Sequence, residues 1–181
     1  MPITTSRSFF ATLCAEGIIT VGRALDLGCG DFVDAKVFVE EGFVVDAVDI
    51  KDLKSELGVE EKINFIQSRI EDFTIKPNFY TFISAQMSLQ FLSRENAQKS
   101  IRDMIKGLTE KGVISLTLIG DRDEWANKDT KWDSWKREEA DAFLAGLPVK
   151  IHKVMTREGE GKTKSGSSKF WHVLSYVMIK G

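Results

Sequence analysis

The chain contains 181 residues, of which 43% are hydrophobic and 29% are charged, and its formal net charge is -2. This length and composition predict a single domain over residues 1–181, in which residues 1–20 form an N-terminal helical cap segment and residues 21–181 form the core. A charge so close to neutral predicts no nucleic-acid partner. No apolar run reaches the roughly 18 residues of a membrane-spanning helix, so no membrane partner is predicted either.

The N-terminal segment carries one of the two cysteines. Residues 9–15 read FFATLCA, and Glu16 follows at once, which predicts a helix and disfavours the apolar centre of a signal peptide. Cys14 lies in this helix and Cys29 in a glycine-containing loop, so we expect reduced thiols in a cytoplasmic protein and no disulfide. The sequence leaves the oligomeric state open.

The next predicted elements form a strand, a glycine loop, a helix and a second strand. Residues 24–32 read ALDLGCGDF, a short apolar strand with an embedded carboxylate that runs into Gly28 and Gly30. Residues 34–42 predict a helix that stops at a glycine, and residues 43–48 predict a strand that ends at Asp49. Because such a unit crosses over right-handed, both strand ends and the helix start converge on one crevice.

This crevice has the pattern of a nucleotide-type cofactor site. The glycines allow the backbone to approach a ligand closely, and Asp49, 21 residues after Gly28, is placed to accept hydrogen bonds from ribose hydroxyls. Val33 stands where a dinucleotide fold has glycine or alanine, and Asp26 would repel a diphosphate, so a cationic ligand fits better than NAD. The alternative is an ordinary strand-to-helix turn in which both aspartates only end strands.

Residues 25–30, LDLGCG, resemble the first motif of the class I methyltransferases that use S-adenosylmethionine. The resemblance implies that Asp26, Gly28 and Gly30 surround the methionine part of this cofactor, with Asp49 at its ribose, and that Ile50 also contacts the cofactor. It also implies an α/β fold with a Rossmann-like, doubly wound, seven-stranded sheet that is mostly parallel and has an antiparallel last strand.

Two further apolar runs, at residues 63–66 and 82–83, predict buried parallel strands. The resemblance implies that the turn after the first of them touches adenine, here through the backbone of Ile70, because Arg69 stands where the family often has an acid. It also implies that Ala85 and Gln86, at the end of the fourth strand, lie where the active site opens.

A helix and a fifth strand follow. Ser93 is a helix N-cap, and apolar residues recur at helical spacing up to residue 108. The stretch at residues 108–118 predicts a turn and then a strand. A segment with three tryptophans comes next, of which Trp125 is in a loop that can cover a substrate, while Trp132 and Trp135 have the helical spacing of residues that pack a following helix.

The last segment predicts a hairpin, with strands at residues 149–155 and 170–180 and a hydrophilic loop at residues 156–169. The final stretch, WHVLSYVMIK, resembles the end of the tellurite-resistance-type methyltransferases. His172 is the candidate general base, and the alternative is a histidine that only makes structural hydrogen bonds.

From these features we expect transfer of a methyl group from S-adenosylmethionine to a small-molecule acceptor by in-line displacement, with no metal site. Two other functions stay open: a non-catalytic module that keeps the cofactor fold as a sensor or partner-binding surface, and an NAD-dependent oxidoreductase. The acceptor atom is not specified by the sequence.

Overall fold

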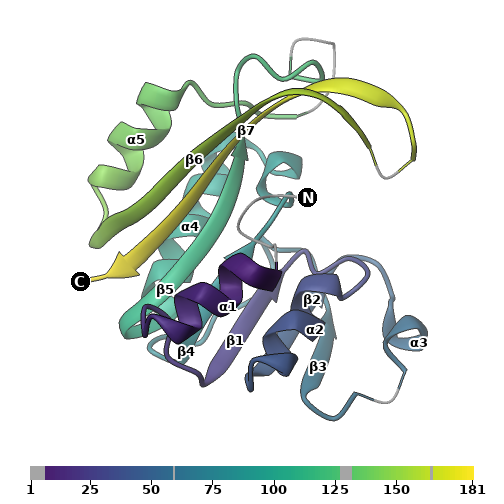
Figure 1. Cartoon of the computed structure of the whole chain (residues 1–181), viewed down its shortest axis with the longest axis vertical. Coiled ribbons are helices and arrows are strands. Elements are labelled where there is room, and N and C mark those ends of the chain that lie inside the picture. The colour runs from purple at the N-terminus through teal and green to yellow at the C-terminus, as the bar shows by residue number, and fades with distance from the viewer. Residues whose placement is uncertain (1–6, 59, 127–131, 164) are drawn as a thin grey trace.

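The computed structural model describes residues 7–58, 60–126, 132–163 and 165–181. Within these ranges a seven-stranded sheet forms the centre of the molecule, with helices on both of its faces (Figure 1). The strands are β1 (Arg23–Leu27), β2 (Val44–Asp49), β3 (Ile63–Gln67), β4 (Tyr80–Ala85), β5 (Leu108–Ile119), β6 (Val149–Lys162) and β7 (Ser168–Lys180). The helices are α1 (Arg7–Ala15), α2 (Val33–Glu40), α3 (Lys54–Leu57), η2 (Leu89–Phe91), α4 (Arg94–Gly107) and α5 (Arg137–Ala145).

The strand order is β3-β2-β1-β4-β5-β7-β6, and only β7 runs antiparallel to its neighbours. The predicted fold class is therefore confirmed. The chain builds outward from β1 to β3 and then returns to place β4 on the other side of β1. The loops that follow β1 and β4 therefore run in opposite directions along the sheet. The crevice between them is the switch point, where open α/β sheets bind their ligands. We call the edge at which β1 to β5 end the strand-end face.

Two separate apolar clusters cover the sheet. On one side, called the α2 face, Phe10 of α1 packs on Phe38 of α2 and on Phe82 of β4, with ring centroids 4.7 and 5.0 Å apart. On the other side, the α4 face, Ile101 of α4 and Leu144 of α5 belong to the second cluster. Figure 1 shows α1 and α2 in front of the sheet and α4 behind it. The N-terminal helix is thus a packed part of the core.

The C-terminal hairpin is longer than the sequence predicts. The predicted loop at residues 156–169 is wrong, because β6 continues to Lys162 and β7 begins at Ser168. Backbone pairing in an antiparallel ribbon does not need apolar side chains, so the polar composition of this stretch concealed its strands. In Figure 1 the far half of the hairpin extends beyond β5 and curves over the top of the molecule.

Neither of the two later tryptophans has a helical backbone. Helix α5 begins only at Arg137, and Trp135 pairs with Gly120 in an isolated bridge, so the helical spacing predicted for Trp132 and Trp135 is wrong. The Trp135 ring still packs on Phe143 of α5, at 5.7 Å between centroids. Its position comes from backbone pairing with the end of β5, a long-range contact that local spacing does not encode.

Helix α4 begins as predicted, because the Ser93 hydroxyl accepts a hydrogen bond from the Asn96 backbone N–H at 3.2 Å. We expect Ser93→Ala to lower the free energy of unfolding by about 1 kcal/mol, since one N–H of the first turn loses its acceptor. Thermal denaturation would show this as a fall in Tm of about 2–4 °C. Ser93→Asp keeps an acceptor and serves as the control, and an equal loss in both variants would contradict the capping role.

Candidate active site at the strand-end face

The glycine loop is tied to the end of β2. The N–H groups of Gly28 and Cys29 both donate to the Val48 carbonyl, at 2.8 and 3.0 Å. Gly28 and Gly30 have φ angles of 77° and 53°, in the left-handed region that favours glycine. A Cβ on Gly28 would lie 2.4 Å from the Cβ of Ser88, so Ser88 fills the space that a side chain at position 28 would need. Conformation and space both require glycine here.

Asp49 closes the loop from the other side. Its Oδ2 accepts the Gly30 N–H and its Oδ1 accepts the Lys51 N–H, each at 3.0 Å. Each carboxylate oxygen has a further lone pair, so the side chain can accept ligand hydroxyls without releasing the loop. Ile50, the next residue, is 57% exposed at the same strand end and offers an apolar surface.

Asp26 is the most unusual charge of this region. Its side chain is 2% exposed, and its Oδ2 has no hydrogen-bond partner among the described residues. Burial raises the pKa of the Asp26 carboxyl well above its usual range, and the negative charges of Asp34 and Asp49 raise this pKa further. A nearby cation would reverse both effects, so the site is suited to a positively charged ligand.

Among the described residues, three more buried polar atoms have no hydrogen-bond partner, and all three lie within β4 or shortly after it: the hydroxyls of Ser84 and Ser88 and the Oε1 of Gln90. Ser84 pairs in register with Asp26 on the neighbouring strand, so both side chains lie on the α2 face. Buried polar groups in native proteins are normally satisfied, and several unsatisfied ones together indicate a place for a polar ligand. Sequence reasoning missed Ser84, although a serine inside an apolar strand was a visible signal.

Ala85, the last residue of β4, and Gln86, which follows it, have different roles. The Gln86 side-chain amide donates to the Ser115 hydroxyl of β5 at 2.9 Å, and the Met87 N–H donates to the Thr117 hydroxyl at 2.6 Å. Ala85 belongs to the cluster on the α4 face, so its side chain points away from Asp26. The hydroxyls of Ser115 and Thr117 extend the polar surface of the α2 face beyond Ser84.

The turn after β3 carries the predicted adenine contact. Ile70 is partly buried and packs on the apolar cluster of the α4 face. The exposed Arg69 guanidinium pairs with Glu71 at 2.8 Å and lies 3.9 Å from Asp72. The positive charge of Arg69 is therefore balanced by acidic side chains of the same turn.

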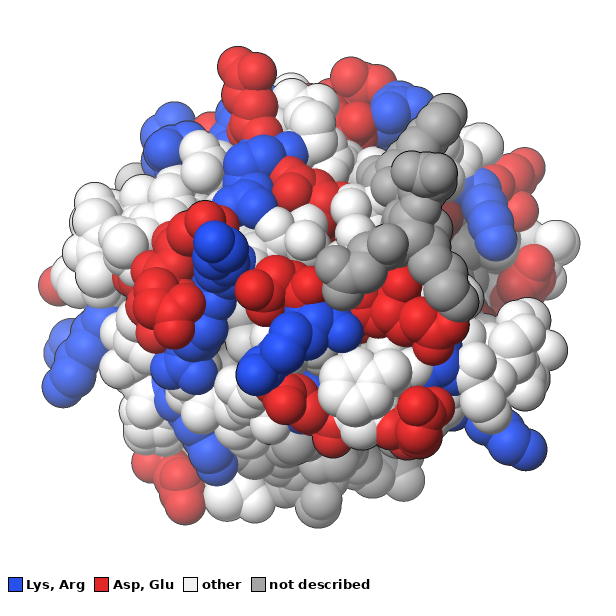
Figure 2. Space-filling model, turned by 90° about the horizontal axis from the view of Figure 1, so that it is seen from above, with Lys and Arg blue, Asp and Glu red and all other residues white. Residues whose placement is uncertain are grey.

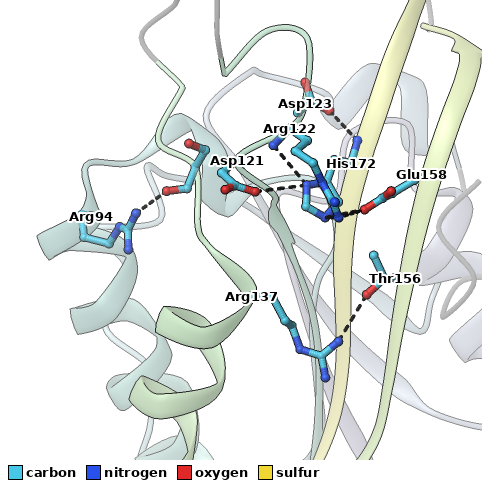
Figure 3. A network of polar contacts seen from close by, with 9 residues as sticks. Arg94, Asp121, Arg122, Asp123, Arg137, Thr156, Glu158 and His172 are labelled. Carbon is cyan, nitrogen blue, oxygen red and sulfur yellow. Dashed lines mark hydrogen bonds and ion pairs between the residues drawn. The ribbon is translucent and has the colours of Figure 1, made fainter.

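His172 does not join this group. It lies on β7, three strands from β1, and shares the α4 face with Leu174, whereas Asp26 is on the α2 face. Its ring covers Gly120, its Nδ1 accepts the Arg122 N–H at 3.1 Å, and its Nε2 is 3.2 Å from Glu158 (Figure 3). These contacts describe a histidine held in place by its neighbours, beside a cavity of about 160 Å³.

Trp125 lies elsewhere on the strand-end side, in an aromatic group. Trp125, Trp132 and Trp171, which we call the tryptophan cage, surround the ammonium of Lys169. Trp125 and Trp132 are in edge contact at 4.6 Å between centroids. The role of Trp125 in covering a substrate remains a prediction, and the cage around it was not foreseen.

The charge on this side of the molecule is mixed. Figure 2 looks down on the top of Figure 1, where the strands end, and positive and negative side chains alternate over the visible surface. Within the described chain, no cluster of three or more His, Cys, Asp or Glu side chains is arranged to hold a metal ion. None of the helices described is both long and apolar enough to cross a membrane.

Comparison with known protein families identifies the family of this chain. The model of the family described as "Tellurite resistance protein TehB" matches residues 4–123, well over half of the chain. The chain belongs to the TehB family. This membership confirms the resemblance seen in the sequence motifs. No curated protein matches the chain significantly.

Solved structures with the same fold include methyltransferases from distant organisms. A S-adenosylmethionine-dependent methyltransferase from Leishmania major is 21% identical with a TM-score of 0.74, and the match covers 97% of this chain and 70% of that one. TehB from Haemophilus influenzae is 18% identical with a TM-score of 0.75, over 95% of this chain and 62% of that one. This TehB-family chain therefore spans less than two thirds of the length of the H. influenzae protein.

A third similar structure contains ligands. The 1,6-didemethyltoxoflavin-N1-methyltransferase from Burkholderia thailandensis, with bound 1,6-didemethyltoxoflavin and S-adenosylhomocysteine, is 14% identical with a TM-score of 0.70. The match covers 98% of this chain and 78% of that one. At these identities the structural similarity establishes that the TehB-family chain shares their fold.

The buried carboxyl of Asp26 makes stability depend on pH. Its pKa is higher in the folded protein than in the unfolded chain, so the unfolded state releases this proton first as the pH rises and stability falls. Asp26→Asn removes this loss. We expect the variant to have a higher Tm than the parent at about pH 8, with the difference shrinking towards about pH 4, the ordinary carboxyl range. Parallel Tm curves for the two proteins would contradict the assignment.

The space around Gly28 can be tested against another glycine. Gly28 and Gly17 have similar φ angles, 77° and 70°, but a Cβ on Gly17 would meet nothing within 4 Å. Gly17→Ala therefore costs only the left-handed strain, about 1–2 kcal/mol. Gly28→Ala adds the collision with Ser88, so we expect a clearly larger loss in chemical denaturation, partly recovered in Gly28→Ala/Ser88→Gly. Equal losses at the two glycines would show that the loop has spare room.

Proposed function

We propose that this TehB-family protein transfers the methyl group of S-adenosylmethionine to a small-molecule acceptor. The observation that carries the proposal is the buried carboxylate oxygen of Asp26 that has no partner among the described residues, beside a loop whose two glycines have left-handed backbone angles. A loop with this geometry can lie against a ligand, and the carboxylate supplies the charge that a cationic ligand needs.

The residues present fit this cofactor. Asp49 would accept hydrogen bonds from the ribose hydroxyls, because its two oxygens each have capacity beyond the loop contacts. Asp26, Gly28 and Gly30 would hold the methionine part, whose ammonium offers Asp26 the missing partner. Ile50 and the backbone of Ile70 would flank the adenine. A buried carboxylate at this position opposes the diphosphate of NAD, which disfavours the oxidoreductase alternative.

The cofactor, when bound, supplies a methyl group already activated on a sulfonium. The protein's own contribution is then to hold an acceptor in line and to exclude water, and correct positioning is worth up to about 7–11 kcal/mol in well-oriented reactions. Ser84, Ser115 and Thr117 form a row of buried hydroxyls on the α2 face that would orient a polar acceptor. A general base is required only where the acceptor must lose a proton.

We infer the size of the acceptor from the segments outside the sheet and its covering helices, because these segments would have to enclose it. The sheet and its covering helices use most of the chain, so the acceptor side is left to the loop that follows β5, the β6–β7 hairpin and the N-terminal segment. The similar fold of the B. thailandensis enzyme, whose printed name gives a small molecule as substrate, agrees with this inference. These features support a small organic or inorganic acceptor.

Calorimetric titration tests the proposal directly. We expect S-adenosylmethionine and S-adenosylhomocysteine to bind and NAD not to bind. Asp49→Ala removes hydrogen bonds to a charged acceptor and should weaken S-adenosylhomocysteine binding about 10- to 100-fold. Asp52→Ala, in an exposed carboxylate three residues away, is the matched control and should bind as the parent does. An affinity unchanged in Asp49→Ala would sink the ribose assignment, and binding of NAD alone would sink the function.

Binding alone does not separate an enzyme from a sensor. Incubation of the loaded protein with pooled amines, thiols, phenols and metalloid oxyanions should release S-adenosylhomocysteine above the rate without acceptor. Turnover with one pool identifies the acceptor atom. Tight cofactor binding with no turnover in any pool would favour the non-catalytic alternative.

A further inference from the structure

The tryptophan cage holds a buried cation. The Lys169 side chain is 1% exposed, and its ammonium lies 3.9 Å from the Trp171 ring centroid, 4.5 Å from Trp125 and 5.3 Å from Trp132. The ammonium also pairs with Asp123, which is fully buried. Lysine is almost never buried without such compensation, so three aromatic faces and a carboxylate together match an alkylammonium.

The cage is fixed independently of its occupant. The Asp123 carboxylate also accepts the N–H groups of Trp125, at 3.0 Å, and His172, at 3.1 Å. Glu124 and Phe170 exchange two hydrogen bonds, at 3.0 and 2.9 Å, which join the loop after β5 to the start of β7. Removal of the Lys169 ammonium would therefore leave the walls and the carboxylate held by other contacts.

The cage is linked to the proposed cofactor site through the segment after β4. The Trp132 ring is in edge contact with Phe91, at 5.3 Å, and Phe91 ends the short helix that begins after Ser88, the residue packed on Gly28. Lys169, Trp171 and Ser175 lie an even number of residues apart on β7, so their side chains are on the same face of the strand. Ser175 pairs with Thr117, one of the buried hydroxyl residues of the α2 face. The cage therefore continues the acceptor side of the α2 face.

We propose that the tryptophan cage and Asp123 form a subsite for an alkylated onium cation, such as a quaternary ammonium or a tertiary sulfonium, on the acceptor side. Lys169 is the internal occupant that a ligand displaces. The role of this subsite in binding the methyl acceptor rests on the proposed function. The chemistry is visible in the structure, because one alkylammonium group already occupies the cage, and aromatic faces bind methylated ammonium groups by the same interaction.

An acceptor of this class needs no general base at the atom that receives the methyl group. A thioether, or a tertiary amine that has already lost its proton to solvent, uses its lone pair to form the new bond to carbon, and the electron pair of the broken carbon–sulfur bond remains on the donor sulfur. The positive charge passes to the acceptor and no proton leaves. The aromatic faces and the Asp123 carboxylate then stabilise the charge that the acceptor has gained.

Lys169→Met tests the subsite, because it keeps an apolar stem and removes the internal cation. Choline is titrated against 3,3-dimethylbutan-1-ol, a neutral molecule of the same shape, with tryptophan fluorescence and calorimetry as readouts. We expect choline to bind Lys169→Met at least about tenfold more tightly than it binds the parent protein. The neutral analogue should bind Lys169→Met at least about tenfold more weakly than choline does. Lys162→Met, an exposed lysine of the same hairpin, is the matched control and should behave as the parent does.

Two variants protect the test against misfolding and against non-specific binding. Lys169→Met leaves a buried carboxylate unpaired and lowers stability, so Lys169→Met/Asp123→Asn is prepared as well, in which both charges are absent. It should retain the preference for choline over the neutral analogue, with lower affinity. Lys169→Met/Trp171→Ala should lose that preference. Equal binding of choline and its neutral analogue, or no binding of choline to folded variants, would overturn the proposal.

The two proposals fail separately. S-adenosylhomocysteine binding to Lys169→Met is measured in parallel and should match the parent, because Lys169 lies outside the glycine loop. Retained cofactor binding without choline binding refutes the cage alone. Choline binding in a protein that does not bind S-adenosylhomocysteine refutes the methyltransferase proposal and leaves an onium-binding module.

Discussion

The position of every group at the strand-end face depends on how the glycine loop is fastened to β2. One carbonyl, that of Val48, accepts two loop N–H groups, and the Asp49 carboxylate accepts a third. These bonds bring the ends of two parallel strands together around a loop that Ser88 touches from the other side. The burial of Asp26, which is 2% exposed, follows from this closure, because the loop and the neighbouring strand enclose its carboxylate.

The βαβ unit could be predicted from the sequence because its signals are local. An apolar run, two glycines, a helix and a second acidic strand end follow one another within about 30 residues, the usual length of such a unit. The mostly parallel, seven-stranded sheet followed from the resemblance of this unit to the methyltransferase family. The unpartnered atoms of Ser84 and Gln90 could not be foreseen, because hydrogen-bond satisfaction depends on neighbours from distant strands.

The C-terminal third was harder to predict, for a different physical reason. The contacts that define the tryptophan cage join residues 123–132 to residues 169–171, and no periodicity relates two segments so far apart. The match to the TehB family also ends at residue 123. The three tryptophans, Lys169 and the hairpin therefore lie beyond the matched segment, and side-chain geometry had to supply the assignment.

The far half of β7 has a consequence for how the molecule meets other chains. Beyond Ile119, β5 no longer pairs with β7, so the backbone N–H groups of Phe170 and His172 would form an open strand edge. The carboxylates of Glu124 and Asp123 accept these two N–H groups in place of a neighbouring strand. Open edges of this kind are templates for pairing between molecules. Two acidic side chains thus close the edge of β7 that faces away from β6, and the outer edge of β6 is the one strand edge that the described hairpin leaves unpaired.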